Sequence, residues 1–107
     1  MASGTVTSDA TEQVAFTTQS GPGFLFWYID LNPMVSGDTV TIREKIDVNN
    51  TGVFSEFQTV EYTGAQTNSV VSQSANLLTD ETIPVRVTIQ QTGGSFKTYQ
   101  YAYGVKF

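Results

Sequence analysis

The chain has 107 residues with ten acidic and five basic side chains, which give a net charge of -5, and it contains neither cysteine nor histidine. A chain of this length forms one domain, residues 1–107, and the missing residue types exclude disulfides, thiolate metal sites and histidine-assisted nucleophiles. The acidic balance argues against nucleic acid and membranes as partners, because phosphate backbones and anionic lipids repel a negative surface.

The composition indicates β-structure, since 39% of the residues are hydrophobic, only 14% are charged, and Thr, Val, Gln, Ser, Tyr and Gly are abundant. Residues 1–5 lack the basic and apolar regions of a signal peptide, and the apolar run at 24–31 is too short to cross a bilayer as a helix. We therefore expect a protein that is made and assembled in the cytosol.

The first predicted strands precede this apolar run. Residues 3–8 predict a short edge strand. Residues 12–17 predict a second strand, in which Val14 and Phe16 alternate with polar or small residues and face the core. A loop with Gly21-Pro22-Gly23 then leads into the apolar run.

The run at 24–31 predicts a central strand with two apolar faces. A helix is the alternative, but the short length, the β-branched and aromatic residues and the flanking Gly and Pro favour a strand. One face carries Phe24, Phe26 and Tyr28, and the other carries Leu25, Trp27, Ile29 and Leu31. A second sheet can cover one of these faces, so we expect a partner surface to cover the other.

The next segments predict a hairpin and a long connection. Residues 39–48 alternate apolar and polar side chains as a half-buried strand does, and Asn49-Asn50-Thr51-Gly52 predicts the turn after it. The strand at 53–62 changes parity, which a bulge near 56–58 would reconcile. Residues 63–82 are mostly polar and predict a connection across the end of a sandwich.

The last third of the chain predicts two more strands, because residues 83–90 alternate cleanly and a Gly-rich turn separates them from residues 96–107. Seven or eight strands without a helix indicate a single-domain antiparallel β-sandwich of jelly-roll type. Its core should bury Trp27, Ile42, Val87 and Ile89.

The carboxylates do not suggest catalysis or metal binding. Asp80 and Glu81 are neighbours in a predicted loop, and Glu56 and Glu61 lie on opposite parities of one strand, so neither pair faces itself across a cleft. The loop at 30–38 has oxygen ligands for calcium but lacks the periodicity of a calcium loop, and turn chemistry explains it. We predict no catalytic residue, metal or cofactor.

An aromatic stripe marks the last strand, where Tyr99, Tyr101 and Tyr103 share one parity. Tyrosines in this pattern can lie at a core margin or a protein interface, or can stack on sugar rings or bases. The acidic balance disfavours bases, so an interface is the first interpretation and a sugar platform the second.

Four sequence motifs resemble a group of short all-β proteins encoded by tailed phages, archaeal viruses and viral sequences from environmental DNA. The motifs are Ile29-Asp30-Leu31-Asn32-Pro33-Met34, Gly37-Asp38-Thr39-Val40-Thr41-Ile42-Arg43, Tyr62-Thr63-Gly64-Ala65-Gln66 and Val87-Thr88-Ile89-Gln90-Gln91-Thr92-Gly93-Gly94. They are turn and strand patterns, and the Tyr-rich ending departs from the group. The resemblance implies a small virion protein that decorates or cements a capsid.

The sequence thus leads to the hypothesis of a non-enzymatic structural virion protein. We expect it to bind the major capsid protein or another virion protein, to reside in the virion, and to form a small homo-oligomer, with a trimer favoured. The alternative is a carbohydrate-binding or host-attachment module of a tail fibre or cell surface. The interface candidates are Leu25, Trp27, Ile29, Tyr99, Tyr101 and Tyr103.

Overall fold

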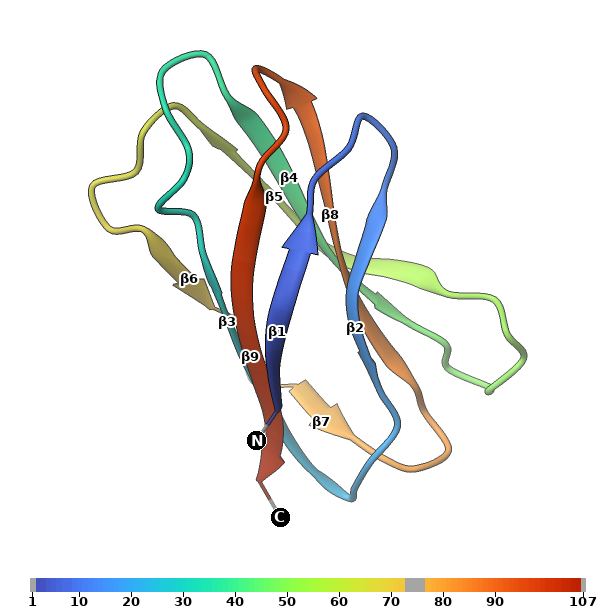
Figure 1. The fold of residues 1–107 in the computed structure, drawn as a ribbon. Helices are drawn as coiled ribbons and strands as arrows, with labels where there is room; N and C mark the ends of the chain where they lie inside the picture. The colour runs from blue at the N-terminus through green and yellow to red at the C-terminus, as the bar shows by residue number, and fades with distance from the viewer. Residues whose placement is uncertain (1, 73–76, 107) are drawn as a thin grey trace.

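The computed structural model describes residues 2–72 and 77–106, and Met1, residues 73–76 and Phe107 lie outside the described part. The described residues form nine strands and no helix, arranged as two antiparallel sheets (Figure 1). The strands are β1 (Ala2–Thr7), β2 (Gln13–Thr18), β3 (Gly23–Asp30), β4 (Thr39–Ile46), β5 (Ser55–Thr63), β6 (Val70–Ser72), β7 (Leu77–Thr79), β8 (Val85–Gly93) and β9 (Thr98–Lys106).

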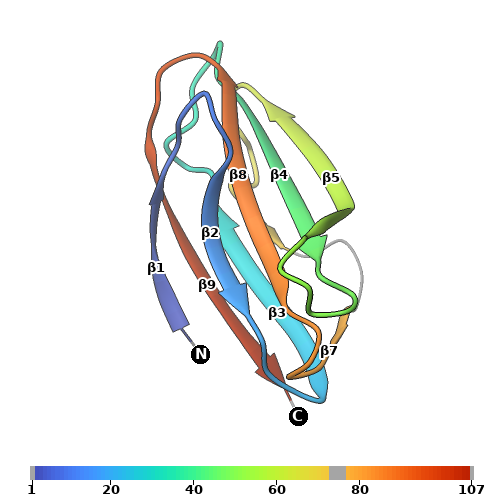
Figure 2. The ribbon, with the colours of Figure 1, turned by 90° about the vertical axis from the view of Figure 1, so that its right-hand side faces the viewer.

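The strand order is that of a jelly roll. The first sheet has the order β1-β9-β3-β6, with β7 also paired to β3, and the second sheet has the order β2-β8-β4-β5. The chain changes sheets at each connection from β1 to β4, and again before β6, β8 and β9 (Figures 1 and 2). This order matches two Greek keys wrapped into two four-stranded sheets, with β6 and β7 sharing one strand position. The predicted jelly-roll sandwich is therefore confirmed.

β3 is the central strand of the first sheet, as predicted from its two apolar faces. It pairs with β9 along one edge and with β6 and β7 along the other. The side chains of Leu25, Trp27 and Ile29 point into the space between the sheets and are at most 2% exposed. On the opposite face, Phe24 is 54% exposed and Tyr28 is 46% exposed.

The core fills the space between the sheets, and the four residues predicted to be buried all lie in it. Ile42 comes from β4, Val87 and Ile89 come from β8, and Trp27 faces them from β3. In the second sheet, β4 and β8 thus each bury the face on which the sequence places their apolar residues. The remaining core residues are Val6, Ala15, Phe16, Leu25, Ile29, Leu31, Met34, Val40, Leu77, Val85 and Tyr99.

The predicted bulge in the fifth strand is confirmed. Along the β4–β5 ladder, Glu44 pairs with Gln58 and Lys45 pairs with Glu56, so Phe57 is the extra residue. A bulge of this kind leaves one residue unpaired and restores the alternation on either side of it. Glu56 before the bulge and Thr59 after it are exposed, and Phe57 itself is 45% exposed.

The turn between β4 and β5 forms where the sequence predicted it. Asn50 has φ 53° and Gly52 has φ 90°, the left-handed conformation that Asn and Gly adopt most easily. Asp47 accepts backbone hydrogen bonds from Thr51 (2.9 Å) and Gly52 (2.6 Å). Burial alone raises the pKa of Asp47, but these hydrogen bonds outweigh it and lower the pKa below its ordinary value.

The segment 63–82 differs from the long connection that was predicted, because it contains β6 and β7. Each has three residues and pairs with β3, β6 at Tyr28–Asp30 and β7 at Gly23–Leu25. The physical reason is that the apolar pairs Val70-Val71 and Leu77-Leu78 provide enough strand to extend the sheet beyond its central strand. This raises the strand count of the described residues to nine.

Candidate functional site

Four of the six interface candidates lie in the core of the sandwich. Leu25, Trp27, Ile29 and Tyr99 are between 0% and 2% exposed, so they cannot contact a partner while the chain is folded. The prediction of an interface at these four residues is wrong. The physical reason is the choice of face: β3 turns the side that carries Leu25, Trp27 and Ile29 inward and leaves the Phe24 side outside, and β9 turns Tyr99 inward.

The tyrosine stripe of β9 also points inward. Across the β3–β9 ladder, Trp27 pairs with Tyr103 and Ile29 pairs with Tyr101, and paired residues share a face of the sheet. The ring of Tyr103 stacks on Phe16 of the second sheet with centroids 4.1 Å apart. Tyr101 and Tyr103 are therefore a partly buried margin of the core.

Tyr99 keeps a polar partner inside the core. Its hydroxyl donates to Oε1 of Gln91 at 3.2 Å, and the same oxygen accepts from Ser8 at 2.6 Å. Burial, together with the charge of Asp38, raises the pKa of Tyr99 to about 12, so the phenol stays protonated. The predicted sugar platform of three tyrosines is wrong, because these rings pack between the sheets.

A band of exposed and half-buried apolar residues lies on the other side of the first sheet. We call it the outer stripe, and it consists of Phe24, Phe26, Tyr28, Val70 and Leu78. Phe24 pairs with Leu78 of β7, and the exposed fractions are 54% for Phe24, 55% for Val70 and 64% for Leu78. The rings of Phe26 and Tyr28 lie 6.5 Å apart along β3. These five side chains form an apolar band that follows β3 on the surface of the molecule.

Small residues on β9 make room for this band. Phe26 pairs with Gly104 and Tyr28 pairs with Ala102. A Cβ atom on Gly104 would come within 2.5 Å of Cζ of Phe26, so the Phe26 ring lies directly across the glycine. Large side chains on β3 thus rest on small ones of β9, a cross-strand arrangement that protects the backbone of the glycine.

Polar groups lie beside the end of the outer stripe that carries Tyr28 and Val70. A surface hollow of about 270 Å³ is lined by Tyr28, Asp30, Val70, Gln100 and neighbouring atoms of β1 and β9. A second hollow of about 150 Å³ shares Asp30 and Gln100 with it and continues toward Asn32 and Thr98. An exposed aromatic ring therefore stands next to a carboxylate and an amide.

The outer face of the second sheet has the opposite character. Glu12 forms an ion pair with Lys45 at 2.7 Å and a longer one with Arg43 at 3.9 Å. Arg43 also forms an ion pair with Glu56 at 3.2 Å. Burial raises the pKa of Glu12, but the hydrogen bonds from Lys45 and Thr88 outweigh it and lower the pKa. Four charged side chains of this face are thus paired with one another.

Two apolar residues of the second sheet are also exposed, Phe57 at 45% and Val14 at 50%. The prediction that Val14 faces the core is wrong, because the register of β2 shifts between Val14 and Phe16.

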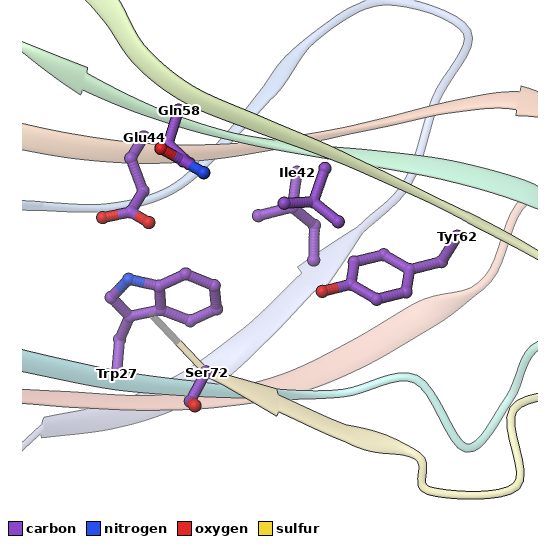
Figure 3. Close-up of a pocket in the computed structure, with 7 residues that line it drawn as sticks. Trp27, Ile42, Glu44, Gln58, Tyr62 and Ser72 are labelled. Atoms are coloured by element: carbon purple, nitrogen blue, oxygen red, sulfur yellow. The ribbon is translucent and has the colours of Figure 1, made fainter. Parts of the chain in front are cut away.

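A partly open pocket of about 180 Å³ lies between the sheets beside β5. It is lined by Trp27, Ile42, Glu44, Gln58, Val60, Tyr62 and Ser72. In Figure 3 the carboxylate of Glu44 and the indole of Trp27 point toward one another across this space. Burial raises the pKa of Tyr62. The pocket combines one carboxylate with two aromatic rings in the interior.

Glu44 is the residue that the sequence analysis missed. It is 3% exposed and lies on the inner face of β4, in the same alternation as Val40 and Ile42. The signal was present, because an acidic residue at an even position of this strand has the parity of the core. It was overlooked among the polar neighbours Arg43 and Lys45.

Two of the carboxylates considered for catalysis and calcium binding, Asp80 and Asp38, have partners within the protein. Asp80 accepts hydrogen bonds from the backbone and hydroxyl of Thr82 at 2.9 and 2.8 Å. Asp38 is 1% exposed, pairs with Nζ of Lys97 at 2.6 Å and accepts from the backbone of Val35 at 3.0 Å. Within residues 2–72 and 77–106, no three His, Cys, Asp or Glu side chains cluster as a metal site would require.

No helix able to cross a membrane occurs in the described part of the chain. Comparison of the chain with protein-family models, with curated proteins and with solved structures finds no match.

Proposed function

We propose that this protein is a non-catalytic structural component of a virion, a capsid decoration protein that docks on another virion protein through the outer stripe. The observation that carries the proposal is the exposure of this band on the central strand of a regular sheet. Large exposed apolar residues that adjoin one another mark interaction sites on soluble proteins. Aromatic residues are also the type enriched at the centres of protein interfaces.

The contrast between the two outer faces supports this orientation. The second sheet pairs Arg43 and Lys45 with Glu12 and Glu56, so the centre of its outer face suits contact with water, and its exposed apolar residues Val14 and Phe57 lie on its two edge strands. The first sheet presents Phe24, Tyr28 and Leu78 instead. Docking through the stripe removes this apolar area from water, which is the main favourable term in association.

The virion setting comes from the resemblance to short all-β viral proteins and from the fold class. Jelly rolls occur in viral capsid proteins and in lectins, so the fold is compatible with both roles without selecting one. The motifs of the resemblance are turn and strand patterns, which identify no individual partner. We therefore propose the partner only as the major capsid protein or another virion protein.

The test replaces Phe24 and Leu78 together by glutamine. The probe is co-sedimentation with capsids of the virus that encodes the chain. We expect the double variant to keep its melting temperature and to bind capsids roughly tenfold or more weakly, because truncating central interface contacts costs more than about 1 kcal/mol each.

The matched control replaces Val48 and Val53 by glutamine. These two residues are 66% and 71% exposed at the β4–β5 turn, away from the outer stripe. This variant should bind capsids as the unmodified protein does. Equal binding by a folded F24Q/L78Q variant would refute the docking surface, and failure of the unmodified protein to bind capsids would refute the role.

A carbohydrate-binding or host-attachment module is the second candidate, and the hollow beside Tyr28 favours it. The ring of Tyr28 could stack on a sugar face while Asp30 and Gln100 bond its hydroxyls. On a glycan array, this role requires binding by the unmodified protein and loss of binding by Y28A. A capsid decoration protein should bind none of the glycans on the array.

A further inference from the structure

The two sheets have four edges, and three of them are interrupted. The β2 edge has a register shift between Val14 and Phe16. The β5 edge has the bulge at Phe57 and carries Glu56 and Glu61. The edge beyond β3 is divided between β6 and β7, which have three residues each. Bulges, charges and short strands are the means by which natural sheets prevent pairing with another chain.

The β1 edge has none of these protections. β1 keeps an unbroken register with β9 over all six of its residues, from Ala2 opposite Tyr103 to Thr7 opposite Thr98. Its sequence, ASGTVT, contains no charge and no proline. Within the described residues β9 alone pairs with β1, and Figure 2 shows β1 at the left margin of the molecule. Its outer edge therefore presents unpaired backbone donors and acceptors.

We infer that β1 pairs in antiparallel orientation with β1 of a second copy of this chain. A strand can pair with an identical strand about a two-fold axis, because the same patch of each copy then forms both sides of the interface. Although each chain carries a net charge of -5, the acidic residue nearest in sequence to β1 is Asp9, beyond its end. The strand itself thus brings no like charges together across the axis.

The side chains indicate a register centred on Thr5. In an antiparallel ladder, residues opposite one another share a face. With Thr5 opposite Thr5, Ser3 meets Thr7 on the outer face, where all three are exposed, and Gly4 meets Val6 on the inner face. Pairs of Ser and Thr hydroxyls on one face stabilise antiparallel strands.

This pairing has two consequences. It yields a two-fold dimer, which differs from the trimer expected from the sequence, and it joins the two first sheets into one continuous sheet. In this register both outer stripes lie on the same side of that sheet. The inference stands on the sheet edges alone and does not depend on the proposed docking role.

The first test measures mass by native mass spectrometry and sedimentation across the micromolar range. The unmodified protein should be a dimer, and T5K should be a folded monomer, because two lysines would then oppose each other across the axis. The matched control is Q100K, which adds the same charge on the same face one strand away from the edge, opposite Thr5. This control should remain dimeric.

A monomeric unmodified protein would overturn the inference, as would dimers of T5K or dissociation of Q100K to the same extent as T5K. A dimer that F24Q/L78Q disrupts and T5K does not would show that the copies meet through the outer stripe instead.

A cross-linking test remains decisive if T5K fails to fold. The chain has no cysteine, so T5C introduces a single thiol, and opposed Cβ atoms in a ladder are close enough for a disulfide. Mild oxidation should convert T5C to a covalent dimer on a non-reducing gel. T59C, on the outer face of the β5 edge, should stay monomeric under the same conditions, and equal cross-linking of both or of neither would contradict pairing through β1.

Discussion

Asp38 holds two distant parts of the chain together. Its carboxylate pairs with Lys97 at 2.6 Å and accepts from the backbone of Ser95 at 3.1 Å, and both residues belong to the segment that leads into β9. The hydrogen bond from Lys97 and those from the backbone of Val35 and Ser95 hold the pKa of Asp38 below its ordinary value. The residue therefore links protonation to stability.

The sign of this linkage gives a pH prediction. Since the pKa of Asp38 is lower in the folded chain than in the unfolded one, its stabilisation is present above about pH 4 and is lost as the pH falls through the folded pKa. We expect D38N to melt at a lower temperature than the unmodified protein near neutrality. Between about pH 5 and about pH 2 its melting temperature should also fall less steeply.

Scanning calorimetry over this pH range checks the expectation, with E81Q as the control because Glu81 is exposed. Parallel pH profiles for D38N and the unmodified protein would contradict the role of Asp38.

Ile42 tests the packing of the core. It is 3% exposed and lies in the second sheet opposite Ile89 and Val60. I42A should lower the free energy of unfolding by about 2–5 kcal/mol, because it removes buried methyl groups and leaves a cavity. Urea denaturation measures this change, and V48A, at an exposed position, should stay within about 0.5 kcal/mol of the unmodified protein. A similar small effect of I42A would contradict the assigned core face of β4.

At the scale of elements, the glycines of two turns allow the cost of backbone strain to be distinguished from the cost of a steric clash. Gly52, between β4 and β5, and Gly94, between β8 and β9, have φ angles of 90° and 80°. A Cβ atom at Gly52 would meet nothing within 4 Å, whereas one at Gly94 would overlap the side chain of Asp38. G52A should cost about 1–2 kcal/mol from conformation alone, and G94A should cost more. Equal losses in denaturant unfolding would show that the β8–β9 turn moves away without penalty.

The elements that the sequence predicted are those in which one face is clearly apolar. Alternation identified β4 and β8, and the change of parity in 53–62 identified the bulge at Phe57. β3 was predicted as the central strand, but alternation could not select its inner face because both faces are apolar. That choice depends on β9, which places Tyr101 and Tyr103 on one side and small residues on the other. Such a cross-strand match is invisible without the register.

The same limit explains the errors in the candidate site. The interface candidates were taken from the apolar strands, where core and surface residues have the same composition. Leu25 and Phe24 are both apolar neighbours in the sequence, yet one is 1% exposed and the other 54%. Conversely, Glu44 was assigned to neither face of its strand, although its parity is that of Val40 and Ile42 and it is 3% exposed. For Phe24 and Leu25, only the packing of the two sheets distinguishes the buried position from the exposed one.

At the scale of the whole molecule, the sandwich has two unlike surfaces on either side of one core. The second sheet exposes paired charges, and the first sheet exposes the outer stripe with a polar hollow at one end. A domain with two such faces can bind a surface in one orientation and present the other face to water. This asymmetry, rather than any single residue, is what the proposed docking role requires.

Trp27 is the one tryptophan of the chain, and it lies in the interior of the sandwich with 2% of its surface exposed. Its fluorescence should therefore be blue-shifted in the folded protein and shift to longer wavelength when the two sheets separate. The rings at the surface are Phe and Tyr, which do not emit in that range. Tryptophan emission thus provides an optical signal for unfolding. Substitutions at the surface, including those at Phe24 and Leu78, should leave this signal unchanged.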